Sequence, residues 1–149
     1  MARISRWIAL AFLCLGVAGC GGPFVLLPGG KLEGRDAPTP SDWSSIADVG
    51  TVQIETQPSD PYSVNIWVVG IGSVAYLHAG ANRANWVVHL ESDPSIRMRV
   101  DEDIYSLRAT RVTTQEEFDR FADAYDEKYS VRPRNENVAE VYLFRLEDA

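Results

Sequence analysis

The sequence has little cysteine and only one extended apolar stretch. Among its 149 residues the only cysteines are Cys14 and Cys20, both near the N-terminus. The rest of the chain therefore cannot form a disulfide or supply the thiolate ligands of a structural zinc site. The apolar stretch Trp7–Val17 has about eleven residues, whereas a helix that spans a bilayer needs roughly twenty. The stretch is therefore short for a membrane-spanning helix and has the length of the apolar part of a signal peptide.

Common catalytic and nucleotide-binding motifs are also missing. The chain contains no G-x-S-x-G, no P-loop and no G-x-G-x-x-G, and His78 and His89 do not have the spacing of H-E-x-x-H. The acidic turn Asp101–Asp103 lacks the spacing and the glycine of an EF-hand loop. The sequence therefore predicts no metal site and supplies no catalytic constellation.

Positive charge is scarce as well. Acidic side chains number 21 against 14 basic ones, and the formal net charge is −7. A protein with this balance repels the phosphate backbone of nucleic acids. We therefore expect no nucleic-acid partner.

The N-terminus has a clear organisation. Arg3 and Arg6 precede the apolar stretch, and Leu15–Cys20 then supplies an aliphatic residue, small residues and a cysteine. This arrangement resembles the signal peptide and lipobox of a bacterial lipoprotein. The resemblance implies cleavage between Gly19 and Cys20 and attachment of lipid to Cys20. An ordinary secretory signal and an uncleaved anchor are the alternatives to a lipoprotein signal.

Lipidation would decide where the protein works. A single acyl chain holds a protein to a membrane only weakly, whereas two or more anchor it stably. Lipoproteins of this kind carry a diacylglycerol thioether and usually an amide-linked acyl chain such as palmitate, so we expect a stable anchor in the cell envelope. Gly21 stands where an Asp would signal retention in the inner membrane. The resemblance therefore favours the outer membrane, in an organism that has one, facing the periplasm or the exterior.

The composition divides the chain into three parts. Residues 1–19 form the predicted signal peptide, and residues 20–48, rich in Gly, Pro, Ser and Asp, form a predicted flexible, lipid-anchored tether. Residues 49–149 form the predicted folded domain, with Trp43 and Ile46 as an alternative starting point.

Hydrophobic periodicity predicts six strands and two helices in this domain. Apolar and polar residues alternate, or apolar residues run together, over 51–55, 63–71, 74–78, 96–100, 105–109 and 138–146. One helix is expected after Asn82, as its cap, and before Asp93-Pro94. A second helix is expected after Thr114, which with Glu117 matches a capping box.

The order β-β-β-α-β-β-α-β predicts a mainly β member of the α+β class, a small barrel of about six antiparallel strands with two helices on its surface. That order resembles the flavin-reductase-like split β-barrel of pyridoxamine-phosphate-oxidase-like proteins and deazaflavin-dependent nitroreductases. The local resemblance lies over residues 66–100, where a hairpin, a helix closing on Asp93-Pro94 and an alternating strand follow one another. It also implies a homodimer, because split barrels commonly build their sites between two copies.

The resemblance implies a position for a cofactor, FMN or a deazaflavin. In such proteins the turn after the third strand and the start of the next helix hold the cofactor phosphate, which helix amides and a cation favour. The matching residues here are His78, Asn82 and Arg83, with Trp86 shaping the pocket. His78 has a second interpretation, as a residue packed in the core.

Two functions remain open at this point. In the first, the domain is a non-catalytic binding or interaction module of a membrane-anchored lipoprotein, since the cationic residues expected around a flavin phosphate are few. In the second, it is a flavin- or deazaflavin-dependent oxidoreductase. The polar loop Arg132–Asn137 is either an ordinary surface loop or a segment that reaches a partner subunit.

Overall fold

The computed structural model describes residues 27–149. The predicted signal peptide, the cleavage position at Gly19 and the lipidation position at Cys20 lie outside these residues. Within them, no helix has the length and apolar character needed to cross a membrane.

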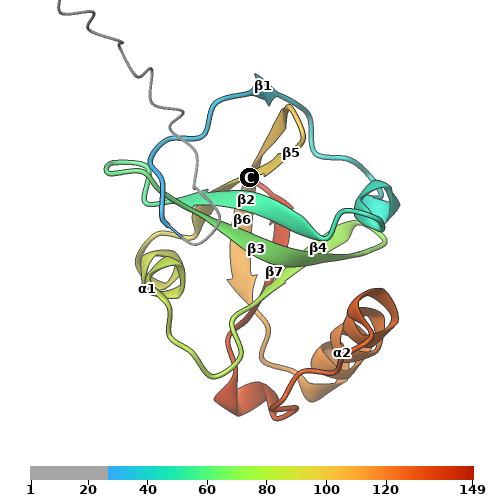
Figure 1. The fold of residues 1–149 in the computed structure, drawn as a ribbon. Coiled ribbons are helices and arrows are strands. Elements are labelled where there is room, and N and C mark those ends of the chain that lie inside the picture. Colours follow the sequence, from blue (N-terminus) through green and yellow to red (C-terminus); the bar gives the residue numbers. More distant parts are fainter. Residues whose placement is uncertain (1–26) are drawn as a thin grey trace, which may run out of the picture.

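Six strands and two α-helices make up most of the described chain (Figure 1). The strands are β2 (Thr51–Thr56), β3 (Tyr62–Ile71), β4 (Val74–His78), β5 (Ser95–Val100), β6 (Asp103–Arg111) and β7 (Leu143–Asp148). The helices are α1 (Asn85–Ser92) and α2 (Gln115–Tyr129). Two short 3-10 helices, η1 (Trp43–Ile46) and η2 (Val138–Glu140), and a two-residue strand, β1 (Arg35–Asp36), complete the fold.

The six strands close into a barrel. They follow the order β6-β5-β2-β3-β4-β7, every neighbouring pair is antiparallel, and β7 returns to pair with β6. At the closure, Ala109 of β6 stands opposite Leu146 of β7. Closure leaves no unpaired edge among these six strands. The predicted element order and the predicted barrel are therefore confirmed.

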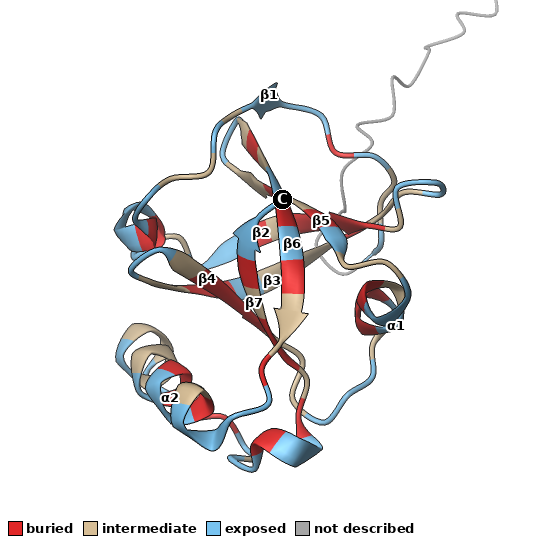
Figure 2. Ribbon diagram, turned by 180° about the vertical axis from the view of Figure 1, so that it is seen from behind, coloured by how far each residue is buried: buried red, intermediate tan, exposed pale blue. Residues whose placement is uncertain are grey.

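Strand alternation divides the apolar side chains between two clusters. Residues such as Ile54, Leu77 and Met98 point into the barrel, where they are fully buried. On the outer face, Val69 and Tyr76 contact Phe121 and other residues of α2. In Figure 2 the buried surfaces of both helices face the barrel and their exposed surfaces face solvent. The barrel thus has an interior core and a second core beneath α2.

The residues before the barrel fold onto it. We call residues 27–48 the N-terminal strap; it runs over the barrel from β3 to η1, and Leu32, Trp43 and Ile46 are buried (Figure 1). Backbone hydrogen bonds hold it in place. The Arg35 N–H donates to the Glu102 carbonyl at 2.7 Å, and the Trp43 N–H donates to the Gly72 carbonyl at 2.7 Å. The prediction of a flexible tether is therefore wrong for residues 27–48. Composition suggested a linker, but three large apolar side chains suffice to dock it.

Both predicted helix caps differ from the structure. Helix α1 begins at Asn85 after Ala84, and the Asn82 side chain makes no capping bond. Thr114 does precede α2, but its hydroxyl does not cap it. Glu117, the other half of the predicted capping box, instead accepts hydrogen bonds from Tyr76 and Arg145. Tertiary partners replace the local partner that the motif predicts.

The last strand starts later than predicted. Residues 138–140 form η2, capped by the Asn137 side chain, which accepts from the Ala139 N–H at 3.1 Å. Strand β7 begins only at Leu143. Val138 and Val141 of the stretch before it are buried in the same cluster as Phe118 and Phe121 of α2. Periodicity alone cannot distinguish such buried residues from those of a strand.

Candidate functional site

The structure separates the four predicted cofactor-binding residues. His78 and Asn82 line the same pocket, between the turn after β4 and the loop after α2. Arg83 does not line that pocket, and Trp86 lines a different hollow beside Tyr62 and Val64. The four residues therefore do not form one site.

Arg83 is engaged by a neighbouring carboxylate. Its Nε lies 2.9 Å from Glu91 Oε2, and a second guanidinium nitrogen contacts the same oxygen. This interaction raises the pKa of Arg83 through hydrogen bonding and charge. A phosphate at this position would have to compete with Glu91 for the guanidinium.

Trp86 belongs mainly to the barrel core. Its side chain is buried and meets Phe144 edge-on, with 5.7 Å between ring centroids. The hollow that it borders is lined otherwise by Leu27, Tyr62, Val64, Asn65, Ile66 and Ala84. That lining has no Lys, Arg, Ser or Thr. The surroundings of Trp86 therefore do not suit a flavin phosphate, which needs cationic or hydroxyl partners.

The pocket at His78 has a volume of about 540 Å³. One wall is aromatic, formed by Trp67 of β3 and Tyr125 of α2. The turn Ala79–Asn82 and the loop Val131–Asn135 complete it. Volumes of this size suit a small organic ligand. Elements far apart in sequence thus build a single pocket.

His78 forms part of the floor of this pocket. Its ring packs against Phe121 and Tyr125, with centroid separations of 5.3 Å and 6.0 Å. Burial lowers the pKa of His78 to about 4, so the ring is neutral at pH 7. Its Nε2 is buried and has no hydrogen-bond partner within residues 27–149. His78 is therefore packed in the core and also borders a pocket, while its role toward a cofactor stays a prediction.

The aromatic wall is held in place from behind. Trp67 stacks on Tyr129, with centroids 4.5 Å apart and an interplanar angle of 11°. The Tyr129 hydroxyl is fixed at 2.8 Å from the Val68 carbonyl, to which it donates. Trp67 nevertheless remains 46% exposed. It is therefore an immobilised aromatic surface that is open to solvent.

The two arginines of the pocket differ in their partners. Arg132 is neutralised by Asp123 at 3.0 Å and Glu136 at 2.7 Å. Arg134 is exposed and has no ion pair or hydrogen bond to any residue from 27 to 149. The sequence pointed to this loop as a polar cluster but gave no sign that it would meet Trp67 and Tyr125. Only the folded structure shows that this loop lines the same pocket as Trp67 and Tyr125.

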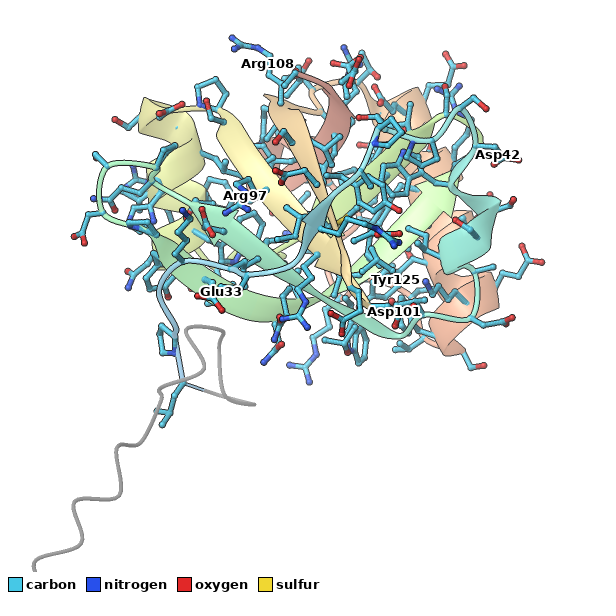
Figure 3. All side chains as sticks on the ribbon, turned by 90° about the horizontal axis from the view of Figure 1, so that it is seen from above. Glu33, Asp42, Arg97, Asp101, Arg108 and Tyr125 are labelled. Atoms are coloured by element: carbon cyan, nitrogen blue, oxygen red, sulfur yellow. The ribbon has the colours of Figure 1, made fainter. Side chains whose placement is uncertain are left out.

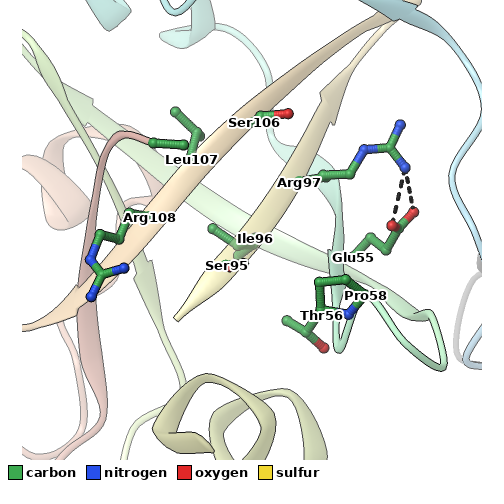
Figure 4. Close-up of a pocket in the computed structure, with 10 residues that line it drawn as sticks. Glu55, Thr56, Pro58, Ser95, Ile96, Arg97, Ser106, Leu107 and Arg108 are labelled. Carbon is green, nitrogen blue, oxygen red and sulfur yellow. Dashed lines mark hydrogen bonds and ion pairs between the residues drawn. The ribbon is translucent and has the colours of Figure 1, made fainter. Parts of the chain in front are cut away.

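A second hollow, of about 400 Å³, lies on the outside of β5 and β6 (Figure 4). Arg97 binds Glu55 there at 2.9 Å, and Glu55 also accepts from the Leu32 N–H of the strap. Figure 4 shows Arg108 on the opposite side of the hollow, pointing away from Arg97. The two arginines do not converge, and Arg97 is paired with Glu55, so this hollow does not present an anion site.

The remaining candidates have structural roles. The Nδ1 of His89 lies 3.0 Å from the Thr56 hydroxyl, and its ring meets Tyr62 edge-on. Across residues 27–149 no group of three His, Cys, Asp or Glu side chains could hold a metal ion.

Comparison with known proteins gives the fold but no closer relationship. No family model and no curated protein matches this sequence. Solved structures do match, among them one from Bacteroides thetaiotaomicron assigned to 5-nitroimidazole antibiotic resistance, with 12% identity over 68% of this chain and 74% of that one, at a TM-score of 0.55. A conserved hypothetical protein from Mycobacterium tuberculosis is 18% identical over 76% of this chain and 83% of that one, at a TM-score of 0.55.

A third match is described as a FAD-binding protein from Mesorhizobium loti. It is 11% identical over 69% of this chain and 82% of that one, at a TM-score of 0.51. At these identities the likeness concerns architecture alone. Together with the closed six-stranded barrel and its two helices, it establishes that this chain has the split β-barrel fold.

Proposed function

We propose that this protein is a lipoprotein of the cell envelope, anchored through lipid on Cys20, whose split barrel is a non-catalytic binding module. The lipobox-like run Leu15–Cys20 supports the anchor. The separation of the predicted phosphate-binding residues supports a binding role over flavin chemistry, since Arg83 is paired with Glu91.

Docking of the strap shortens the proposed tether. Six residues lie between Cys20 and Leu27, the first described residue, so seven residue-to-residue steps join the two. A fully extended chain spans at most about 3.6 Å per residue, so these residues reach roughly 25 Å. The barrel would therefore lie close to the membrane surface rather than at the end of a long linker.

Metabolic labelling tests the anchor. Cells that express the full chain are fed an alkynyl palmitate, and labelled protein is detected in the membrane fraction. We expect label on the natural chain, and loss of both label and membrane residence in Cys20→Ser. Cys14→Ser is the matched control, because that residue precedes the proposed cleavage position and should leave labelling intact. Equal labelling of all three chains would refute lipidation at Cys20.

A second candidate, a flavin- or deazaflavin-dependent oxidoreductase, is favoured by the fold. The FAD-binding protein from Mesorhizobium loti has a similar barrel. Asn82 and Arg83 stand at the positions that the resemblance assigns to phosphate binding. The cofactor would supply hydride or electron transfer, while this chain would provide only phosphate and ring contacts.

Thermal denaturation with FMN, and separately with a deazaflavin cofactor, separates the two candidates. A ligand at a hundred times its Kd stabilises a fold by about 2.7 kcal/mol, which gives a measurable rise in Tm. We expect no rise for the binding module. A rise that Arg83→Ala abolishes would favour the oxidoreductase instead, with Arg120→Ala, another surface arginine paired to a glutamate, as the control.

A further inference from the structure

The lining of the pocket at His78 includes two arginines and no acidic side chain, although acidic side chains outnumber basic ones in this chain. Three other hollows each include a carboxylate, from Glu55, Glu127 or Asp101, and the hollow at Trp86 has no charged lining residue. His78 adds no charge to the floor at pH 7. The pocket is therefore suited to a ligand of negative charge.

Arg134 is the cation available to such a ligand. Arg132 is already held by Asp123 and Glu136, whereas Arg134 has no partner in the described part of the chain. A guanidinium fits a carboxylate with two parallel hydrogen bonds. The carboxylate of a ligand would therefore find its partner in Arg134.

The opposite wall selects the rest of the ligand. Trp67 and Tyr125 present aromatic surface, and Trp67 is already fixed by stacking on Tyr129. Aromatic rings prefer offset-stacked or edge-on partners, and an immobilised ring loses little entropy when a ligand binds. A flat ring fits this wall better than a branched aliphatic group.

We propose that the His78 pocket binds a small planar aromatic or heteroaromatic carboxylate, with its ring against Trp67 and Tyr125 and its carboxylate on Arg134. The inference rests on the proposed binding function and names the class of ligand. The pocket shares His78 and Asn82 with the positions that the fold resemblance assigns to a cofactor, but Arg83 and Trp86 do not line it.

Calorimetric titration of the full chain with indole-3-acetate, indole-3-acetamide and cyclohexylacetate tests this assignment. We expect indole-3-acetate to bind about tenfold more tightly than the amide, which is about 1.4 kcal/mol. Arg134→Gln should remove that difference, and Trp67→Leu should weaken both indole ligands. Cyclohexylacetate, which keeps the charge but lacks a flat ring, should bind more weakly than indole-3-acetate.

Arg108→Gln is the control for charge. This exposed arginine lies on another side of the barrel from Tyr125 (Figure 3), and its loss should leave the titrations unchanged. Equal affinity for the acid and the amide, selectivity that survives Arg134→Gln, or absence of binding by every probe would overturn the assignment. Failure here leaves the labelling at Cys20 and the flavin test unaffected, so the two proposals fail separately.

Discussion

His78 combines a packed ring with a position at the floor of the pocket. The aromatic side chains of α2 partly shield it from water, and burial lowers its pKa to about 4. Its strand neighbours on the same face, Val74 and Tyr76, also pack beneath α2. The alternation in the sequence predicted that shared face, but not the pocket beside it.

The depressed pKa of His78 predicts acid sensitivity. An unfolded histidine has a pKa of about 6.5, so between pH 6.5 and 4 the unfolded chain binds more protons and the free energy of unfolding falls as pH falls. A shift of one pKa unit corresponds to about 1.36 kcal/mol. Since the ring is only partly shielded, we expect the free energy of unfolding to fall by about 2 kcal/mol over this pH interval, which is less than the whole shift would give.

Urea titrations at several pH values in this window measure the effect. His78→Phe should flatten the dependence on pH over that interval. Val74→Ala, on the same strand face, removes apolar contact without removing a titratable group, and should retain the slope. An unchanged slope in His78→Phe would show that another group causes the acid sensitivity.

Glu55 joins the barrel to the strap. Its carboxylate is buried, is bound by Arg97, and accepts from the Leu32 N–H. Removal of Glu55 would leave Arg97, whose side chain is 27% exposed, with the longer 3.9 Å contact to Asp36, and would leave the Leu32 N–H without its acceptor. The loss of such a partly buried pair costs about 2 kcal/mol. We expect Glu55→Ala to lower the free energy of unfolding by about this amount in urea denaturation.

The exposed pair Arg35–Asp103 provides the comparison. Its arginine is 76% exposed, and such surface pairs contribute about 1 kcal/mol or less. Arg35→Ala should therefore change stability little. Similar losses in Glu55→Ala and Arg35→Ala would contradict the anchoring role assigned to Glu55.

At the scale of elements, the strap shows how weakly composition indicates packing. Residues 27–48 are rich in the residue types of linkers, yet Trp43 contacts Tyr105 edge-on with 5.1 Å between centroids. Lys128 of α2 also donates to the Ile46 carbonyl at 2.8 Å. The strap is therefore an element of the fold, held by both the barrel and α2.

Gly70 permits the approach of η1 to β3. A Cβ at this position would lie 2.6 Å from the Trp43 carbonyl oxygen and 2.8 Å from the Trp43 Cβ. Since neither atom can move without shifting η1, we expect Gly70→Ala to cost about 2 kcal/mol and to speed proteolysis within residues 37–48.

Gly50→Ala serves as the matched control for this substitution. A Cβ at Gly50 would meet nothing within 4 Å, so the change should leave both stability and the proteolytic pattern close to those of the natural chain. If Gly70→Ala behaves like Gly50→Ala, the close packing of η1 on β3 does not contribute to stability.

At the scale of the whole molecule, barrel closure and strap docking define the folded unit. Strand β7 completes the barrel by pairing with both β4 and β6, so the C-terminal strand is essential to it. The strap adds Leu32, Trp43 and Ile46 to the buried residues. The folded unit therefore includes residues 27–48 as well as residues 49–149.

Truncation tests this boundary. A chain that starts at residue 49 loses the buried strap side chains and the backbone partner of Glu55, whereas a chain that starts at residue 27 keeps them. We expect the shorter chain to melt at least about 10 °C below the longer one, since 1 kcal/mol shifts the Tm of a domain of this size by roughly 4–8 °C. Equal melting temperatures of the two chains would show that residues 27–48 do not stabilise the fold and act only as a linker.

The sequence by itself determined the order of strands and helices, the barrel class and the buried face of β4. These follow from periodicity, since alternation along a strand and the 3.6-residue period of a helix depend only on nearby residues. The export and lipidation hypothesis also rests on local sequence alone, at Leu15–Cys20.

The tertiary structure alone decided which side chains meet. It bound Arg83 to Glu91, gave Glu117 to Tyr76 instead of a capping box, and docked the strap. It also brought Trp67 and Arg134, far apart in sequence, to one pocket. Such contacts depend on how distant elements pack, and nothing in the pattern of neighbouring residues records that packing.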